Sequence, residues 1–119
     1  MKKHIVVVDD DAAILDAIGL TLQEEGYKVT TFSRGHNFLH FIKDNDADLI
    51  ILDMLLSGMD GRDITKAIKK DKDKKDIPVL MISAHPSAFK SVGISGADAF
   101  LPKPFDTLDL LLEVERLAV

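Results

Sequence analysis

Two short runs of branched apolar residues, each ending in aspartate, constrain the fold of this chain more than any other feature. The first run covers residues 5–8 and is followed by Asp9 and Asp10, and the second covers residues 49–52 and is followed by Asp53. Uninterrupted runs of this length are typical of strands that are buried on both faces of a parallel sheet. Ligands bind at the carboxyl ends of the strands in open α/β sheets, so we expect these carboxylates to lie in one crevice.

Crowding of these carboxylates needs a physical reason. Two ionised carboxylates about 5 Å apart repel each other by about 3 kcal/mol at an effective dielectric constant of about 20. A chain tolerates this repulsion where a cation or a chemical task requires the charges. The pattern therefore indicates a cation site or a reactive carboxylate at this edge of the sheet.

The composition limits the class of protein. A length of 119 residues with 46% hydrophobic residues predicts one domain, residues 1–119, with a real core. The net charge of −5 disfavours a nucleic-acid-binding surface, and the lack of cysteine excludes disulfides, thiolate catalysis and Cys-ligated zinc. No run is long enough for a signal-peptide core or a membrane span, so we expect a soluble cytoplasmic protein.

Strand-like and helix-like segments alternate along the chain. We predict strands at residues 5–8, 28–32, 49–53, 78–83 and 99–101. Helix-like patterns cover residues 14–22, 37–43, 64–68, 87–94 and 105–117. A turn is expected at 57–61, and a solvated helix end and loop at the lysine- and aspartate-rich run 69–76. Five strands that alternate with five helices predict an α/β fold with a doubly wound parallel sheet.

The predicted strand ends carry an ordered set of polar residues that resembles the receiver domain of two-component response regulators. The set consists of Asp9 and Asp10, then Asp53, Ser83 and Lys103. Its flanking motifs are Gly58-Met59-Asp60-Gly61, Ile82-Ser83-Ala84, Gly96-Ala97-Asp98 and Leu101-Pro102-Lys103-Pro104-Phe105. The resemblance spans nearly the whole chain, which it identifies as one receiver domain. It implies the flavodoxin-like strand order 2-1-3-4-5, with the site at the topological switch point.

The resemblance implies a role for each polar residue of the set. Asp53 would be the nucleophile that accepts a phosphoryl group. Asp10 would bind Mg²⁺, which Mn²⁺ could replace, and Asp9 would act directly or through a bound water. Asp53 itself and the main-chain carbonyl of Leu55 would complete the metal site. Lys103 would pair with a phosphoryl oxygen or, before transfer, with the carboxylates.

Further implied roles concern the switch and the lifetime of the signal. Ser83 would donate its hydroxyl to a phosphoryl oxygen, and Phe100 would move inward when that hydroxyl moves. Leu55 and His85 would flank the path of the hydrolytic water, and we expect shielding by Leu55 to prolong the phosphorylated state. The peptide bond between Lys103 and Pro104 is expected to be cis. The resemblance implies no organic cofactor.

The function implied is that of a phosphoacceptor signalling module, which assists its own phosphorylation and dephosphorylation but is not an enzyme. The donor would be the phosphohistidine of a sensor histidine kinase or phosphotransfer protein. An output domain or downstream protein, which the sequence does not identify, would read the surface near the fifth strand and its flanking helices. A weak homodimer is left open, and neither direct nucleic-acid binding nor membrane binding is implied.

Two alternative functions stay open at this point. A pseudo-receiver would keep the fold as an interaction module without phosphoryl chemistry. The chain argues against it because it retains the residues Asp10, Asp53, Ser83 and Lys103. A haloacid-dehalogenase-type phosphatase also uses an aspartate at a strand end. That family has a second aspartate two residues on, where this chain has Leu55.

Several other residues have simpler interpretations. Asp11 directly precedes the first helix, so we interpret it as the helix N-cap rather than a ligand. His36 and His40 are expected on the polar side of a helix, not at a metal. Ser57 replaces a proline of many family members, and we expect it to loosen the loop after Asp53 without affecting the chemistry. The last helix leaves two leucines, Leu108 and Leu112, toward solvent.

Overall fold

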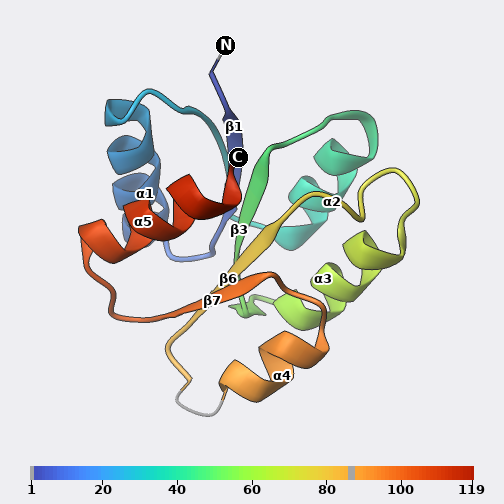
Figure 1. The fold of residues 1–119 in the computed structure, drawn as a ribbon. Helices are drawn as coiled ribbons and strands as arrows, with labels where there is room; N and C mark the ends of the chain where they lie inside the picture. The colour runs from blue at the N-terminus through green and yellow to red at the C-terminus, as the bar shows by residue number, and fades with distance from the viewer. Residues whose placement is uncertain (1, 86–87) are drawn as a thin grey trace.

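The computed structural model describes residues 2–85 and 88–119 and shows a five-stranded sheet with helices on both faces (Figure 1). The strands of this sheet are β1 His4–Val8, β2 Lys28–Phe32, β3 Leu49–Asp53, β6 Val79–Ser83 and β7 Ala99–Pro102. The helices are α1 Ala12–Glu24, α2 Gly35–Asp44, α3 Gly61–Lys70, α4 Ala88–Ile94 and α5 Thr107–Leu117. Two short strands, β4 Leu55–Leu56 and β5 Met59–Asp60, form a separate hairpin between β3 and α3.

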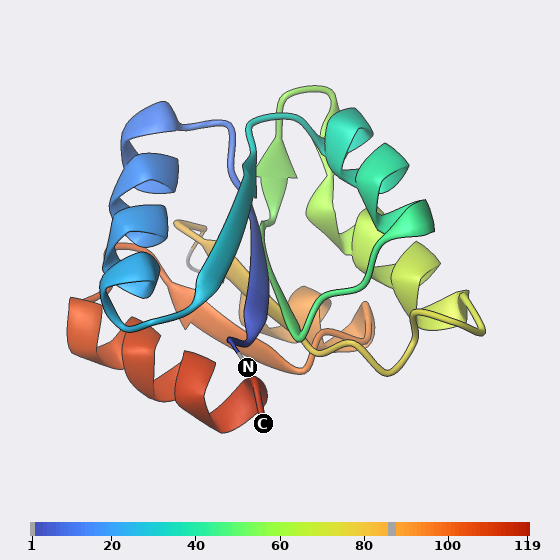
Figure 2. The same ribbon diagram turned by 90° about the horizontal axis from the view of Figure 1, so that it is seen from above.

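The strand order of the main sheet is β2-β1-β3-β6-β7, and every pairing in it is parallel. Counted along the chain, these five strands have the predicted order 2-1-3-4-5. Helices α1 and α5 cover one face of the sheet, and α2, α3 and α4 cover the other, as the two views in Figures 1 and 2 show. The prediction of a doubly wound α/β fold is therefore confirmed.

The core consists of two apolar layers, one on each face of the sheet. Strands β3 and β6 are buried along their whole length, which explains why they read as uninterrupted apolar runs. Phe38 of α2 and Ile64 of α3 belong to the layer on one face, and Leu22 of α1 and Val114 of α5 belong to the other. This packing holds the strand ends, and the polar residues that follow them, in fixed positions.

The segment after β3 differs from its prediction. The turn expected at 57–61 is a hairpin turn at Ser57 and Gly58, flanked by β4 and β5, and α3 begins at Gly61. Gly58 has a φ of +76°, a conformation that glycine adopts without steric cost. The predicted starting residue of the fourth helix, Ser87, lies outside the described residues.

The lysine-rich run 69–76 is a helix end and a loop, as predicted, and only Lys69 and Lys74 in it are partly buried. The Lys69 ammonium lies 2.7 Å from the Asp98 carboxylate and donates to the carbonyl of Ile77 at 2.8 Å. The Lys74 ammonium lies 2.9 Å from the carboxylate of Asp46. These lysines tie the end of α3 to neighbouring loops, because their long side chains reach acceptors that lie far away in the sequence.

Other expectations at the helix ends are confirmed. The Asp11 side chain accepts hydrogen bonds from the amides of Ala13 and Ile14 at the start of α1, as an N-cap does. On α5, Leu108 and Leu112 are 64% and 55% exposed. No helix in the described part of the chain is long and apolar enough to cross a membrane.

Candidate functional site

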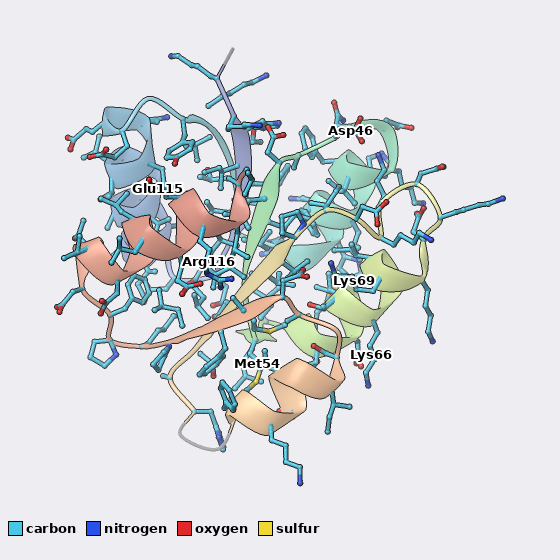
Figure 3. All side chains as sticks on the ribbon, in the orientation of Figure 1. Asp46, Met54, Lys66, Lys69, Glu115 and Arg116 are labelled. Atoms are coloured by element: carbon cyan, nitrogen blue, oxygen red, sulfur yellow. The ribbon has the colours of Figure 1, made fainter. Side chains whose placement is uncertain are left out.

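The polar residues predicted at the strand ends lie together at one edge of the sheet. Asp9 follows β1, Asp53 ends β3, Ser83 ends β6 and Lys103 follows β7. Asp9, Asp53 and Ser83 are 0%, 7% and 3% exposed, whereas Asp10 is exposed. In Figure 3, Met54, the residue after Asp53, lies at this edge, and Asp46 lies at the opposite edge. The sheet therefore brings together residues that are up to 94 positions apart in the sequence.

Lys103 is the cation of this site. Its Nζ atom donates to Asp9 Oδ2 at 3.0 Å and lies 3.5 Å from Asp53 Oδ1. The main-chain N–H of Lys103 donates to the carbonyl of Ser83 at 2.8 Å, which fixes the start of its loop beside β6. The peptide bond between Lys103 and Pro104 is cis, as predicted. One ammonium group thus contacts two carboxylates that end neighbouring strands.

Three carboxylates form a group that could hold a metal ion. Asp9, Asp10 and Asp53 each offer one oxygen, and these oxygens lie within 4.8 Å of one another. An all-oxygen set suits a hard cation such as Mg²⁺ and lacks the nitrogen and sulfur ligands that zinc sites contain. Leu55, whose main-chain carbonyl is a predicted ligand, lies two residues past Asp53 in β4.

The electrostatic surroundings raise the pKa of Asp53. Burial is the largest cause, and the negative charge of Asp9 adds to it, so that the pKa of Asp53 rises from 3.8 to about 6 although Lys103 opposes the shift. For Lys103, burial lowers the pKa, but the hydrogen bond to Asp9 and the charge of Asp53 outweigh it and raise the pKa above its usual value. At neutral pH both groups are therefore charged, and Asp53 is poised between its two protonation states just below neutrality.

Ser57 contributes to the site in a way that the sequence did not predict. Its main-chain N–H donates to Asp10 Oδ2 at 3.0 Å, and its hydroxyl donates to the same oxygen at 2.8 Å. The expectation that Ser57 leaves the chemistry unaffected stays a prediction, although both donors bind a predicted metal ligand. The only feature of the sequence that could have indicated this contact was a hydroxyl residue in the turn after Asp53.

The predicted switch residues lie on neighbouring strands. The Ser83 hydroxyl accepts a hydrogen bond from the main-chain N–H of His85 at 3.0 Å. Phe100, in β7, is half-buried and packs edge-on against Phe89 of α4, with ring centroids 5.9 Å apart. Phe89 is itself 72% exposed. The ring of Phe100 therefore links β7 to an exposed aromatic side chain of α4.

The two residues that we expect to affect hydrolysis lie beside one another. Leu55 and His85 both line a hollow of about 300 Å³, together with Met54 and Arg62. The side chain of Leu55 is more than half exposed. The hollow adjoins the end of β3, because Met54, the residue after Asp53, also lines it.

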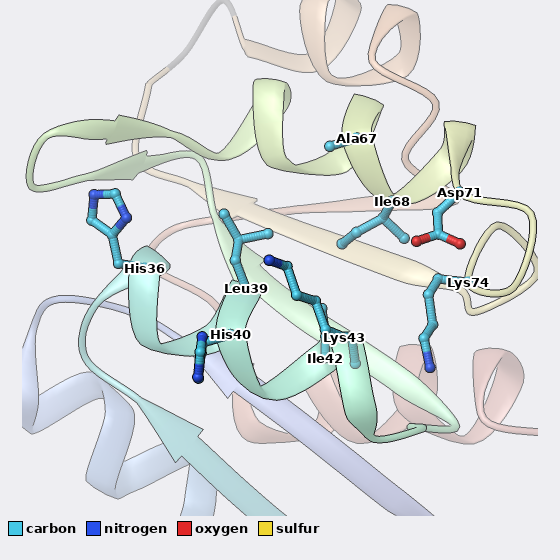
Figure 4. A pocket seen from close by; sticks show the side chains of 9 residues that line it. All are labelled: His36, Leu39, His40, Ile42, Lys43, Ala67, Ile68, Asp71 and Lys74. Atoms are coloured by element: carbon cyan, nitrogen blue, oxygen red, sulfur yellow. The ribbon is translucent and has the colours of Figure 1, made fainter.

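The two histidines of α2 lie elsewhere. His36 and His40 line a hollow of about 420 Å³ between α2 and α3, whose walls include the apolar side chains of Leu39 and Ile68 (Figure 4). The two imidazole rings point in different directions in this view. Neither histidine belongs to the carboxylate group at the strand ends.

Known proteins share both the sequence pattern and the fold. The model of the response regulator receiver domain family matches residues 5–115. The structure is similar to the chemotaxis response regulator CheY4 of Vibrio cholerae, with 30% identity, 98% of this chain and 99% of that chain covered, and a TM-score of 0.91. It is also similar to NtrX of Brucella abortus, solved in complex with ATP, with 34% identity, a TM-score of 0.89, and 99% of this chain but 27% of that chain covered.

A third similar structure holds a metal ion. The receiver domain of the sensor histidine kinase PA1611 from Pseudomonas aeruginosa was solved with a magnesium ion coordinated in its active-site cleft. It is 22% identical to this chain, covers 99% of this chain and 98% of its own, and gives a TM-score of 0.91. At this level of identity the similarity shows a common fold.

Proposed function

This chain belongs to the response regulator receiver domain family, and on that basis we propose that it accepts a phosphoryl group on Asp53. Receiver domains are signalling modules rather than classical enzymes. The observation that carries the proposal is the position of Lys103, whose ammonium lies 3.0 Å from Asp9 and 3.5 Å from Asp53 at the end of β3. A carboxylate so placed has a positive group at hand to balance the charge of an incoming phosphoryl group.

The proposed transfer proceeds from the phosphohistidine of a sensor kinase or phosphotransfer protein. An Asp53 carboxylate oxygen attacks the phosphorus atom, the new O–P bond forms, and the N–P bond breaks with its electron pair staying on the imidazole nitrogen. Only the ionised carboxylate is nucleophilic, and with a pKa of about 6 Asp53 is mostly ionised at pH 7. Lys103 and the hydroxyl of Ser83 then bind oxygens of the phosphoryl group.

The donor set fits Mg²⁺, which Mn²⁺ could replace. Asp9, Asp10 and Asp53, with the main-chain carbonyl of Leu55, would hold the ion; Asp9 would act directly or through a water. When bound, the ion neutralises negative charge on the phosphoryl oxygens. Support comes from three carboxylate oxygens within 4.8 Å of one another, and from the pKa of Asp53, which burial raises and the negative charge of Asp9 raises further.

The proposed output is a change in the surface formed by β7, α4 and α5. When the Ser83 hydroxyl turns toward the phosphoryl group, Phe100 moves inward and its contact with Phe89 is lost. The exposed side chains of Phe89, Leu108 and Leu112 lie on the helices that flank β7. We therefore place the contact with an output domain, a downstream protein or a second copy of the chain on this surface.

Mass measurement after incubation with acetyl phosphate and Mg²⁺ tests the proposal. We expect one added phosphoryl group in the wild type and none in Asp53→Asn. Asp16→Asn, an exposed carboxylate of α1, is the matched control and should be labelled like the wild type. Equal labelling of Asp53→Asn would refute the assignment of Asp53. A wild type that acetyl phosphate and cognate phosphohistidine donors all fail to label would instead identify a pseudo-receiver.

A further inference from the structure

Ser57 connects two segments that the proposed metal site must bring together. It lies in the turn of the β4–β5 hairpin, immediately after the strand that contains Leu55. Its N–H and hydroxyl both donate to Oδ2 of Asp10, which lies 47 residues earlier, just past the end of β1. The hairpin and the end of β1 are therefore joined at this point by two hydrogen bonds to one oxygen atom.

We propose that Ser57 is a positioning residue that prepares Asp10 and the hairpin for the cation and so sets the Mg²⁺ affinity of the site. This inference rests on the proposed function, since it assumes that Asp10 is a metal ligand. It assigns a role to a side chain that lies beyond the carboxylates themselves. Such partners orient the ligands of a metal and affect its affinity strongly.

The hydrogen bonds leave Asp10 able to bind a cation. Both donors bind Oδ2, and within the described part of the chain Oδ1 accepts no hydrogen bond. Asp10 is exposed, so without Ser57 its carboxylate would be free to rotate in water. Binding a cation would then have to immobilise the side chain, which costs entropy. In the folded protein the two hydrogen bonds already hold the side chain, so cation binding does not carry this cost. The two neutral donors also reduce the attraction of the Asp10 carboxylate for a cation. The proposal requires that the entropy saved by fixing the side chain outweighs this reduction.

The rest of the hairpin is already fixed, which makes the tether effective. Leu55 pairs with Asp60 across the hairpin, and the N–H of Gly61 donates to the carbonyl of Met54. A side chain at Gly61 would collide with the main-chain carbonyl of Asp53, so the base of the hairpin is packed directly on the end of β3. Ser57 fixes the other end, and the main-chain carbonyl of Leu55 lies between these two anchor points.

A graded set of variants tests the proposal. Ser57→Ala removes the hydroxyl and keeps the N–H, Ser57→Pro removes both donors, and Ser57→Thr keeps both. Ser33→Ala is the matched control, because Ser33 is an exposed loop serine whose hydroxyl has no hydrogen bond within the described residues. Mg²⁺ is titrated into each metal-stripped protein by calorimetry, and urea unfolding without metal shows that each variant is folded.

We expect Ser57→Ala to weaken Mg²⁺ binding about tenfold and Ser57→Pro to approach a hundredfold loss, which spans the usual effect of removing such a partner. Ser57→Thr and Ser33→Ala should bind like the wild type. The urea midpoint of Ser57→Ala should stay unchanged. A purely structural role of Ser57 would give the opposite result, in which the midpoint changes and the Mg²⁺ affinity does not. In labelling with acetyl phosphate, the half-saturating Mg²⁺ concentration should rise while the rate at saturating Mg²⁺ stays the same.

Three results would overturn the proposal. Unchanged affinity in Ser57→Ala and Ser57→Pro would show that the hydrogen bonds do not prepare the site, and tighter binding would show that Ser57 competes with the cation for Asp10. A wild type that binds no Mg²⁺ removes the inference together with the metal site. A wild type that binds Mg²⁺ but takes no phosphoryl group refutes the proposed function and leaves the role of Ser57 intact.

Discussion

Replacing Asp53 by asparagine should stabilise the metal-free protein, although it removes the proposed reactive group. The folded state holds this carboxylate at a pKa of about 6, against 3.8 without the fold, because burial and the charge of Asp9 disfavour its ionised form. A difference of about two pKa units corresponds to about 3 kcal/mol of unfolding free energy. That value already includes the attraction of Lys103, so it is the net cost of ionising Asp53 in the folded protein.

The sign of the pH dependence follows from which state binds the proton more tightly. Between pH 3.8 and about 6 the folded state keeps the proton of Asp53 while the unfolded state has lost it. The contribution of Asp53 to stability therefore falls as the pH rises through this window, and the full cost applies above it. Asp53→Asn carries no such cost, so its advantage should be close to zero near pH 4 and reach about 3 kcal/mol above pH 7.

Urea unfolding followed by circular dichroism, in EDTA from pH 4 to 8, measures this difference. Asp16→Asn is the control, since exposed substitutions away from special features change stability by less than about 0.5 kcal/mol. An Asp53→Asn protein that is no more stable than the wild type at pH 7.5 would contradict the electrostatic account of the site. A stabilisation of equal size at pH 4 and pH 7.5 would also contradict it, because the cost would then not come from ionisation.

Two further predictions concern residues around Asp53. Lys103→Gln removes the group that lowers the pKa of Asp53, so that pKa should rise above about 6 in a carbon-13 NMR titration; an unchanged or lower value would contradict the assigned ion pair. Leu55→Asn should lose phosphate from Asp53 faster than the wild type, because a polar side chain can orient the water that leucine excludes. Unchanged rates in both Leu55→Asn and His85→Ala would show that neither residue governs the lifetime.

The strands of the main sheet could be predicted closely because buried strands appear in the sequence as uninterrupted apolar runs. Strand β3, Leu49–Asp53, covers the apolar run 49–52 and the aspartate that follows it, since both faces of this strand are covered by helices. The β4–β5 hairpin was missed because strands of two residues are too short to show any periodicity. Its existence depends on the local turn at Gly58 and on the close packing of Gly61 against the main chain of Asp53 and Met54.

The sequence was sufficient to predict which residues form the site. It was not sufficient to predict how their burial and their hydrogen bonds differ. In the sequence, Asp9 and Asp10 look equivalent. In the structure, Asp9 is fully buried and accepts hydrogen bonds from Lys103 and from the N–H of Asp11, whereas Asp10 is exposed and bound to Ser57. These differences arise from contacts between distant segments, which one sequence does not reveal. The position of Ser57 in the chain gave no reason to connect it with Asp10.

The separation of Lys103 from the acids has a consequence for how the chain folds as it leaves the ribosome. Strands β1 and β3, whose pairing places Asp9 beside Asp53, are both synthesised before β7. Their ammonium partner follows β7, at the edge of the sheet, and is synthesised 94 residues after Asp9. A partly made chain in which β1 and β3 have paired therefore holds Asp9 and Asp53 without the ammonium of Lys103, and docking of β7 reduces their repulsion. The weaker repulsion between Asp9 and Asp53 thus favours the docking of β7, the edge strand that is synthesised last.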